Sequence, residues 1–173
     1  MAQLQRLPNI ESRPVDPIER YFYEMRNRLS WLLQMTGEKV LYFRRLYDGE
    51  KCPNWDKIRQ QHSQMDTCDQ CYGTGFKGGY HRPIEISLSL ITPNPYRARI
   101  YEYGTRRELA QNGWTIYEPP LQNKDFFVRR DDTRLWVVDV KETRWRGHIL
   151  TYRFNTEEIE PRHPIYKLPE GCV

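Results

Sequence analysis

Three cysteines and the glycines that follow them constrain the fold of this chain more than any other feature. Cys68 and Cys71 have the C-x-x-C spacing with which two thiolates grip one metal ion from a tight turn, and Cys52 precedes them. Glycine backbone can fold back without Cβ clashes, and the run contains Gly73, Gly75, Gly78 and Gly79. The pattern predicts a metal-pinned loop over residues 51–82, inserted between two strands and called the cysteine loop below.

A tetrahedral structural zinc site needs four ligands, and this loop offers three thiols. The first candidate for the fourth ligand is His62, between Cys52 and the C-x-x-C pair; His81 and Asp56 are the alternatives. An iron–sulfur cluster would normally use four cysteines, so zinc is the favoured metal. The alternative is that the loop has lost a ligand, binds no metal, and folds through packing and turns alone. Cys172 stands alone near the end of the chain and is expected to be a free thiol.

No set of residues in the sequence has the pattern of a catalytic site. A catalytic zinc requires an open coordination position and a general base in a pocket. Glu85 is near the loop, but the alternation of its strand places it on the polar face. Asp131-Asp132 is typical of a turn, and Thr74 lacks the Lys-Ser/Thr of a phosphate-binding loop. We therefore predict that the chain is not an enzyme.

Composition indicates one domain with much of its surface available for contacts. The chain has 173 residues, of which 38% are hydrophobic and 29% charged, so a single core is expected. A net charge of +4 is too mild for a typical nucleic-acid-binding protein. No apolar run approaches the roughly 20 residues of a membrane span, so no membrane contact is expected. Abundant Arg, Tyr and Trp are the residues enriched in protein–protein interfaces.

The N-terminal part is predicted to be an arm followed by a long helix. Residues 1–15 contain prolines among polar residues and are expected to be extended. Asp16 is a good N-cap with Pro17 in the first turn, and the helix is expected to end near Met35 with Gly37 as its stop. Its apolar stripe is spaced alternately by four and three residues, at Ile18, Phe22, Met25, Leu29 and Leu32.

The remainder is predicted to be mostly antiparallel sheet. Alternation or β-rich composition predicts strands at 40–46, 83–90, 97–103, 126–130, 135–141 and 149–154, the last two in a hairpin. Thr105-Arg106-Arg107-Glu108 has the pattern of a capping box, so a short second helix ending at Gly113 is expected. The predicted fold is α+β over residues 16–160, mainly an antiparallel β barrel or sandwich. Residues 161–173 are predicted to be an extended tail.

The tip of the predicted hairpin, Arg144-Trp145-Arg146-Gly147, has two readings that stay open. It is either a solvated turn with a partly buried Trp, or an interface loop in which an aromatic anchor and flanking Arg groups meet another subunit. Arg129-Arg130 and Arg106-Arg107 are either solvated faces or, if they converge, part of a DNA-facing channel.

The cysteine loop also carries a family resemblance. It resembles a family of tailed-bacteriophage virion proteins of the neck, or head–tail connector, through the run Cys68-x-x-Cys71-Tyr72-Gly73-Thr74-Gly75-Phe76-x-Gly78-Gly79-Tyr80 followed by Pro83-Ile84-Glu85-Ile86. The likeness spans about residues 17 to 168 and includes 35–40, 134–138 and 145–148. Relatives tend to carry a further cysteine where Trp55 stands, so metal binding carries over to Cys52, Cys68 and Cys71.

The resemblance implies a structural virion protein without enzymatic activity. It would form a homo-oligomeric ring at the capsid–tail junction and contact portal, tail or other neck proteins, with non-specific contact to DNA in the channel. Two other classes are the alternatives. A small zinc-containing nucleic-acid-binding module would need a basic face around the cysteines, where Asp66 and Asp69 stand instead. A metalloenzyme would need a base and an open ligand position.

Overall fold

The computed structural model describes residues 17–56, 61–62, 68–91, 99–101, 104–106 and 111–168. The predicted arm, 1–15, lies outside these ranges. The main elements are α1 (Pro17–Thr36), β1 (Glu38–Phe43), β4 (Ile84–Ile91), β7 (Gln111–Ile116), β8 (Phe126–Val128), β9 (Arg134–Trp145) and β10 (His148–Glu158). Two small ribbons are formed by β2 (Trp55–Asp56) with β3 (Gln61–His62) and by β5 (Arg99–Tyr101) with β6 (Gly104–Arg106), and a 3-10 turn, η2, covers Pro164–Lys167.

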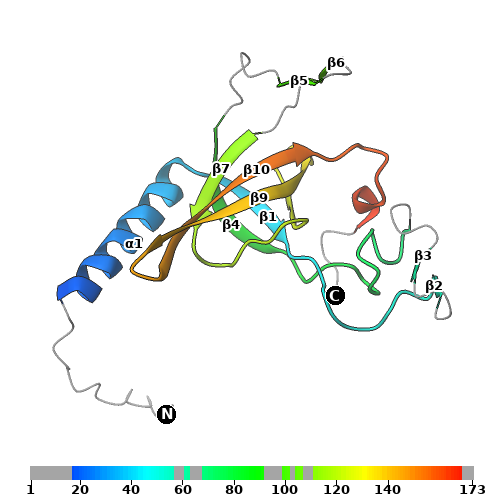
Figure 1. The fold of residues 1–173 in the computed structure, drawn as a ribbon, viewed down its shortest axis with the longest axis horizontal. Coiled ribbons are helices and arrows are strands. Elements are labelled where there is room, and N and C mark those ends of the chain that lie inside the picture. The colour runs from blue at the N-terminus through cyan, green and yellow to red at the C-terminus, as the bar shows by residue number, and fades with distance from the viewer. Residues whose placement is uncertain are drawn as a thin grey trace, which may run out of the picture.

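The six main strands form a closed antiparallel barrel in the order β1-β4-β7-β10-β9-β8 (Figure 1). Closure comes from β1, which pairs with β4 along one side and with β8 along the other. The predicted α+β fold with a barrel and one long helix is therefore confirmed. The cysteine loop leaves the barrel between β1 and β4, and α1 lies at the opposite end of the molecule (Figure 1).

Alternating apolar residues explain why these segments form a barrel. The barrel core is lined by inward residues of facing strands, among them Tyr42, Leu88, Val137 and Phe154, all at most 3% exposed. A second cluster, called the end cluster, lies at the end near the cysteine loop. It contains Phe43, Tyr80, Phe126, Val128, Ile159, Ile165 and Leu168. Burial of this apolar surface contributes about 25 cal/mol per Å² to folding, so both clusters stabilise the closed sheet.

Helix α1 packs on the barrel along a stripe slightly different from the predicted one. Phe22 and Leu33 are buried, whereas Leu32, predicted to face the core, is 41% exposed. Leu29 and Leu33 are four residues apart and continue the face begun by Phe22, so the step of four replaces the expected step of three. Gly37 ends the helix as predicted: its N–H donates to the Leu33 carbonyl at 2.8 Å, and a Cβ there would lie 2.4 Å from that oxygen.

The predicted second helix is wrong. Thr105 and Arg106 belong to β6, Gln111 to Gly113 begin β7, and residues 107–110 lie outside the described ranges. Gly113 is not a helix stop. A Cβ at this position would lie 2.6 Å from the Phe154 ring and 3.0 Å from Leu90, so the glycine makes room for a barrel core side chain.

Part of the predicted extended tail instead packs against the barrel. Pro164 to Lys167 form η2, and Ile165 and Leu168 are buried in the end cluster. Arg134, itself buried, donates a hydrogen bond from Nη1 to the Ile165 carbonyl. The tail was predicted as extended because its prolines disfavour regular structure, but two apolar side chains fix its first part. Residues 169–173 lie outside the described ranges.

The hairpin tip is a turn that packs within the chain. β9 and β10 are joined by Arg146 and Gly147, with φ of 48° and 85°, values typical of a tight hairpin turn. Trp145 stacks on Phe22 of α1 with ring centroids 6.0 Å apart, and Arg146 lies over the Trp145 ring. Trp145 is half-buried, as expected for the first of the two interpretations of this tip, a turn with a partly buried Trp.

Candidate metal centre

The three cysteines of the loop converge on one point. The Sγ atoms of Cys52, Cys68 and Cys71 all lie within 4.8 Å of one another, and all three residues are buried. None of them forms a disulfide. Three thiols at this separation are close enough to bind one metal ion, which is what the spacing predicted.

The backbone between the cysteines explains how they meet. A turn after Cys68 is closed by Tyr72 N–H donating to the Cys68 carbonyl at 2.9 Å, and Thr74 N–H then donates to the Cys71 carbonyl at 2.9 Å. Cys52 N–H donates to the Gly75 carbonyl at 3.0 Å, which brings the first cysteine onto this turn. The buried Thr74 hydroxyl also donates to the Cys71 carbonyl at 2.7 Å.

Gly79 is the glycine whose missing side chain matters most here. Its φ is +69°, and a Cβ would lie 2.7 Å from the Cys71 carbonyl oxygen. The neighbouring Gly78, with φ of +81°, would place a Cβ in open space. The chain can therefore return past the C-x-x-C turn only because residue 79 is a glycine.

The environment of Cys68 favours a thiolate. Burial alone would raise the pKa of its thiol, but N–H groups of Gln70 and Cys71 and the side-chain amide of Asn54, 3.5 Å away, hydrogen-bond the sulfur and hold the pKa below its ordinary value. Burial raises the pKa of Cys52, whose Sγ lies 3.7 Å from that of Cys68. A thiol whose pKa is lowered in this way is a suitable start for metal capture, which requires thiolates.

Of the candidates for the fourth ligand, the structure describes the side chains of His81 and Asp56. The backbone of His62 pairs with Trp55 in the β2–β3 ribbon, while its side chain lies outside the described part of the structure. His81 is exposed and its N–H donates to the Arg44 carbonyl at 2.9 Å, and Asp56 is half-buried. Among the described side chains, the cysteines form the group that could hold a metal, without His81 or Asp56.

The cysteine loop is attached to the barrel at several points. Arg45 donates from Nη2 to the Gly73 carbonyl at 3.0 Å, and Leu46 N–H donates to the Gly79 carbonyl at 3.0 Å. Tyr80 leaves the loop and packs edge-on against Phe126 at 4.8 Å. The three thiols are therefore held in position by contacts with the end cluster as well as by the turn itself.

A buried carboxylate, Asp125, organises this end of the barrel and was not identified from the sequence. It is fully buried and accepts hydrogen bonds from the Tyr42 hydroxyl, from Arg45 N–H at 2.8 Å and from Gln122 N–H at 2.9 Å. Burial raises the pKa of Asp125, although these three hydrogen bonds lower it in part. Arg45, whose side chain holds the cysteine loop, is thus fixed through its backbone by Asp125.

Comparison with known proteins gave no assignment: no family model matches the chain, and no curated protein matches it. In the described ranges, no helix combines the length and apolar composition needed to cross a membrane.

Proposed function

We propose that this chain is a structural virion protein of a tailed phage, forming part of the neck ring between the capsid portal and the tail. The observation that carries the proposal is the apolar surface of α1. Trp31 is 63% exposed and Met35 67% exposed, one helical turn apart, and Leu32 and Tyr21 are also exposed. Trp31, Leu32 and Met35 lie within about one turn of the helix, and exposed apolar side chains grouped in this way favour a protein–protein contact.

The proposal also rests on the motif in the cysteine loop and on the position of the two features. A ring is built from heterologous contacts, in which two different surfaces of each subunit meet. The α1 surface and the cysteine loop lie at opposite ends of the barrel (Figure 1). Such a subunit can present one end to a preceding neighbour and the other to the next.

Zinc is the metal that we propose for the cysteine site. Thiolates are soft ligands that suit zinc, and a closed zinc site stabilises a loop too small to have its own core. Cys52, Cys68 and Cys71 would hold the ion, and its contribution would be structural. Metal analysis of purified protein tests this directly: about one equivalent of zinc is expected, and loss of the zinc in Cys68→Ser should follow. Less than about half an equivalent would exclude zinc as the resident metal.

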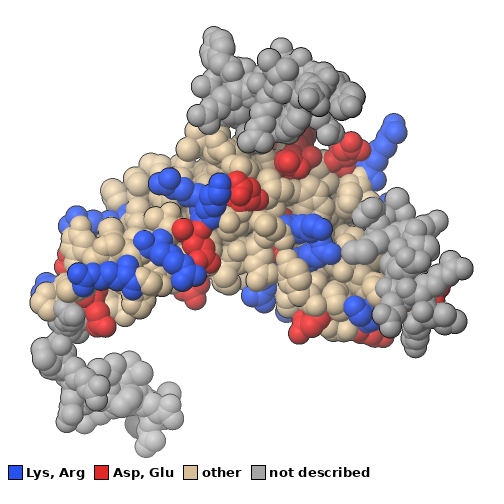
Figure 2. All heavy atoms as spheres, in the orientation of Figure 1, with Lys and Arg blue, Asp and Glu red and all other residues tan. Residues whose placement is uncertain are grey.

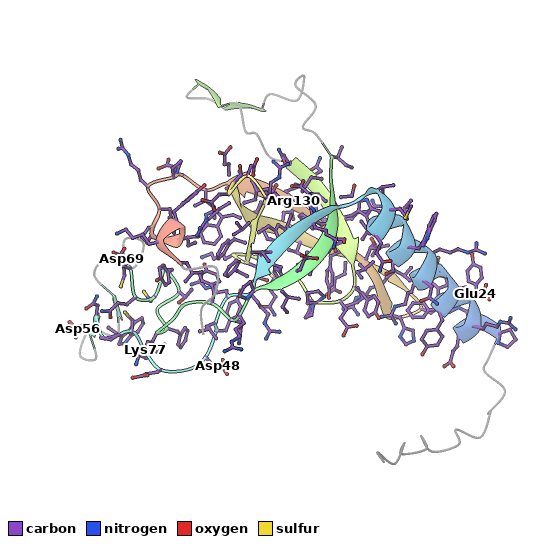
Figure 3. The ribbon with its side chains drawn as sticks, turned by 180° about the vertical axis from the view of Figure 1, so that it is seen from behind. Glu24, Asp48, Asp56, Asp69, Lys77 and Arg130 are labelled. Carbon is purple, nitrogen blue, oxygen red and sulfur yellow. The ribbon has the colours of Figure 1, made fainter. Side chains whose placement is uncertain are left out.

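Nucleic-acid binding around the cysteines has less support. Lys77 pairs with Glu50 at 3.3 Å and Lys167 with Asp69 at 2.7 Å. Asp48, Asp56 and Asp69 surround this end of the molecule (Figure 3), and basic and acidic groups are interspersed on the face in Figure 2. Arg129 makes a two-pronged ion pair with Glu38 at 2.7 and 3.1 Å. Salt-dependent binding of free DNA by the purified chain would favour this alternative.

The role in the neck can be tested in the phage that encodes the chain. Deletion should give capsids and tails that fail to join, as seen by electron microscopy, and the chain supplied from a plasmid should restore joining. Trp31→Glu should not restore it, because a charge would then stand in the proposed interface. Gln122→Glu adds the same charge at an exposed position of the barrel away from α1 and should restore it. Normal head–tail joining without the chain would refute the proposal.

A further inference from the structure

A cavity lies between the cysteine loop and the barrel, separate from the thiols. Its volume is about 360 Å³, within the range of small-molecule sites. Tyr72 and Gly73 of the cysteine loop form one wall, and Trp136 and Val138 of β9 form another. Arg45 and Lys124 also line it, together with Glu157 of β10. The cavity is thus shaped by segments that are far apart in sequence.

The backbone of this cavity is held in an unusual conformation at two points. Tyr72 has φ of 49° and Lys124 has φ of 69°, the left-handed region that side chains rarely adopt. Each such residue costs about 1–2 kcal/mol. Both are fixed by hydrogen bonds, from Tyr72 N–H to the Cys68 carbonyl and from Lys124 N–H to the Val137 carbonyl, each at 2.9 Å. Backbone strain of this kind concentrates at binding sites.

The charges around the cavity favour an anion with a single negative charge. Arg45 is anchored by its bond to Gly73, and the exposed Lys124 ammonium has no ion-pair partner among the described residues. Glu157 contributes one negative charge to the same lining. Two positive charges and one negative leave a surplus of one, which suits a carboxylate better than a phosphate dianion.

The remaining lining is aromatic and apolar, apart from the imidazole of His163, which packs edge-on against Trp136. Trp136 and Tyr72 are both half-buried, and Val137 and Val138 complete this part of the wall. A planar apolar group can bury its surface against these side chains, and aromatic pairs gain further from their ring electrostatics.

We propose that this cavity binds a small aromatic carboxylate. The ring lies against Trp136 and Tyr72, and the carboxylate meets Lys124 and Arg45. Because Tyr72 directly follows Cys71 in the chain, the thiol turn supports one wall of the site. The inference concerns ligand binding only and does not depend on the proposed role in the neck.

Binding can be followed by NMR of the full chain with indole-3-acetate as the probe. The indole N–H signal of Trp136, assigned with Trp136→Phe, should shift saturably. Indole-3-acetamide has the same ring without the charge and should bind at least about 10-fold more weakly, because a hydrogen bond to a charged group is stronger. Inorganic phosphate should not displace the probe at equal concentration.

Two variants with opposite expected effects test the charges. Lys124→Asn removes the ammonium but keeps a residue that tolerates positive φ, and it should weaken binding about 10-fold. Glu157→Gln should tighten binding about threefold, since the nearby negative charge is lost. Lys141→Asn, at an exposed position outside the cavity, should leave the affinity unchanged.

The proposal is overturned by any of three results. The first is a Trp136 signal that does not saturate below about 10 mM probe, a concentration well above the dissociation constants of ordinary specific sites. The second is equal affinity for the acid and the amide. The third is equal affinity of Lys124→Asn and the unaltered chain for the probe. Because Glu157 is exposed, Glu157→Gln tests the charge even if Lys124→Asn disturbs the local backbone.

Discussion

Asp125 supports the junction between barrel and cysteine loop through Arg45, from whose N–H it accepts a hydrogen bond and whose side chain binds Gly73. Its carboxylate accepts from three donors that belong to three segments: β1, the chain just after β1, and the turn before β8. Asp125→Asn keeps the shape but replaces one acceptor oxygen by a donor. We expect it to lower the free energy of unfolding at pH 7 by about 2 kcal/mol, the cost of leaving buried donors unsatisfied. Urea unfolding of both proteins measures this loss.

The same residue predicts a pH dependence. Burial holds the pKa of Asp125 above its ordinary value in the folded chain, so the folded protein binds the proton more tightly than the unfolded one. The stability from this group is therefore fully present below the unfolded pKa, about 3.9, and is lost as pH rises through the folded pKa. The difference in unfolding free energy between the unaltered chain and Asp125→Asn should grow as pH is lowered from 7 toward 4. A difference that shrinks over this range would contradict the expectation.

Gly78 and Gly79 form a matched pair for testing the cysteine turn. Both have positive φ, but only a Cβ at Gly79 would collide with the Cys71 carbonyl. Gly78→Ala should cost about 1 kcal/mol for the left-handed backbone and leave the three thiols in place. Gly79→Ala should cost at least about 2–3 kcal/mol, because backbone must move as well. Thermal unfolding and bound-metal content of the two variants provide the comparison, and similar values for both would contradict it.

At the scale of elements, the contact between α1 and the β9–β10 hairpin adds to the packing of the helix against β4 and β7. Trp145 stacks on Phe22, and His148 lies 5.0 Å from the same ring. Trp145→Ala should lower the free energy of unfolding by about 2 kcal/mol, less than the 3–5 kcal/mol of a fully buried aromatic because this Trp is half-buried. Arg144→Ala, on the same strand and exposed, should change it by less than about 0.5 kcal/mol. Urea unfolding separates the two.

The sequence predicted those elements whose signals are local. The cap pattern Asp16-Pro17, Gly37 as a stop and the alternation from Ile84 to Leu90 predicted α1 and β4, because these signals lie within or beside the segments themselves. The prediction of a second helix failed because Gly113 does not end a helix. It is a glycine because the ring of Phe154, from another strand, packs against its backbone. The burial of Ile165 likewise depends on a cluster assembled from distant strands.

Some residues of the candidate site could be predicted from the sequence, and others could not. Cys52, Cys68 and Cys71 could be chosen from their spacing, since a C-x-x-C turn and a preceding thiol are read along the chain. Asp125 could not, because a single aspartate before a strand carries no sign of burial, and two of its three donors come from β1 and the chain just after it. The cavity beside Trp136 likewise exists only after β9, β10 and the loop are brought together.

For the whole molecule, the three thiols and the barrel core are separate clusters. Removing the proposed zinc with a chelator should therefore loosen the cysteine loop without unfolding the barrel. Hydrogen exchange measured by mass spectrometry should increase over residues 68–79 and stay unchanged in β9 and β10. The thermal midpoint should fall by no more than about 4 °C, the shift that accompanies roughly 1 kcal/mol at this size.

Cys68→Ser is the control for that experiment, because a variant without bound metal should not respond to the chelator. Complete unfolding on chelation, or loop exchange that stays unchanged, would contradict the expected separation.

The pairing of β8 with β1 has a consequence for how copies of this chain can meet. Because the sheet closes on itself, none of its six strands is an edge strand along its full length, so a neighbour cannot extend the barrel as it would extend an open sheet. In the proposed ring, contacts between copies would then depend mainly on side chains of the helix and the loops. The backbone hydrogen bonds of the barrel can stay the same while exposed side chains on the helix and loops change. Substitutions that alter which surfaces bind each other therefore need not alter the fold.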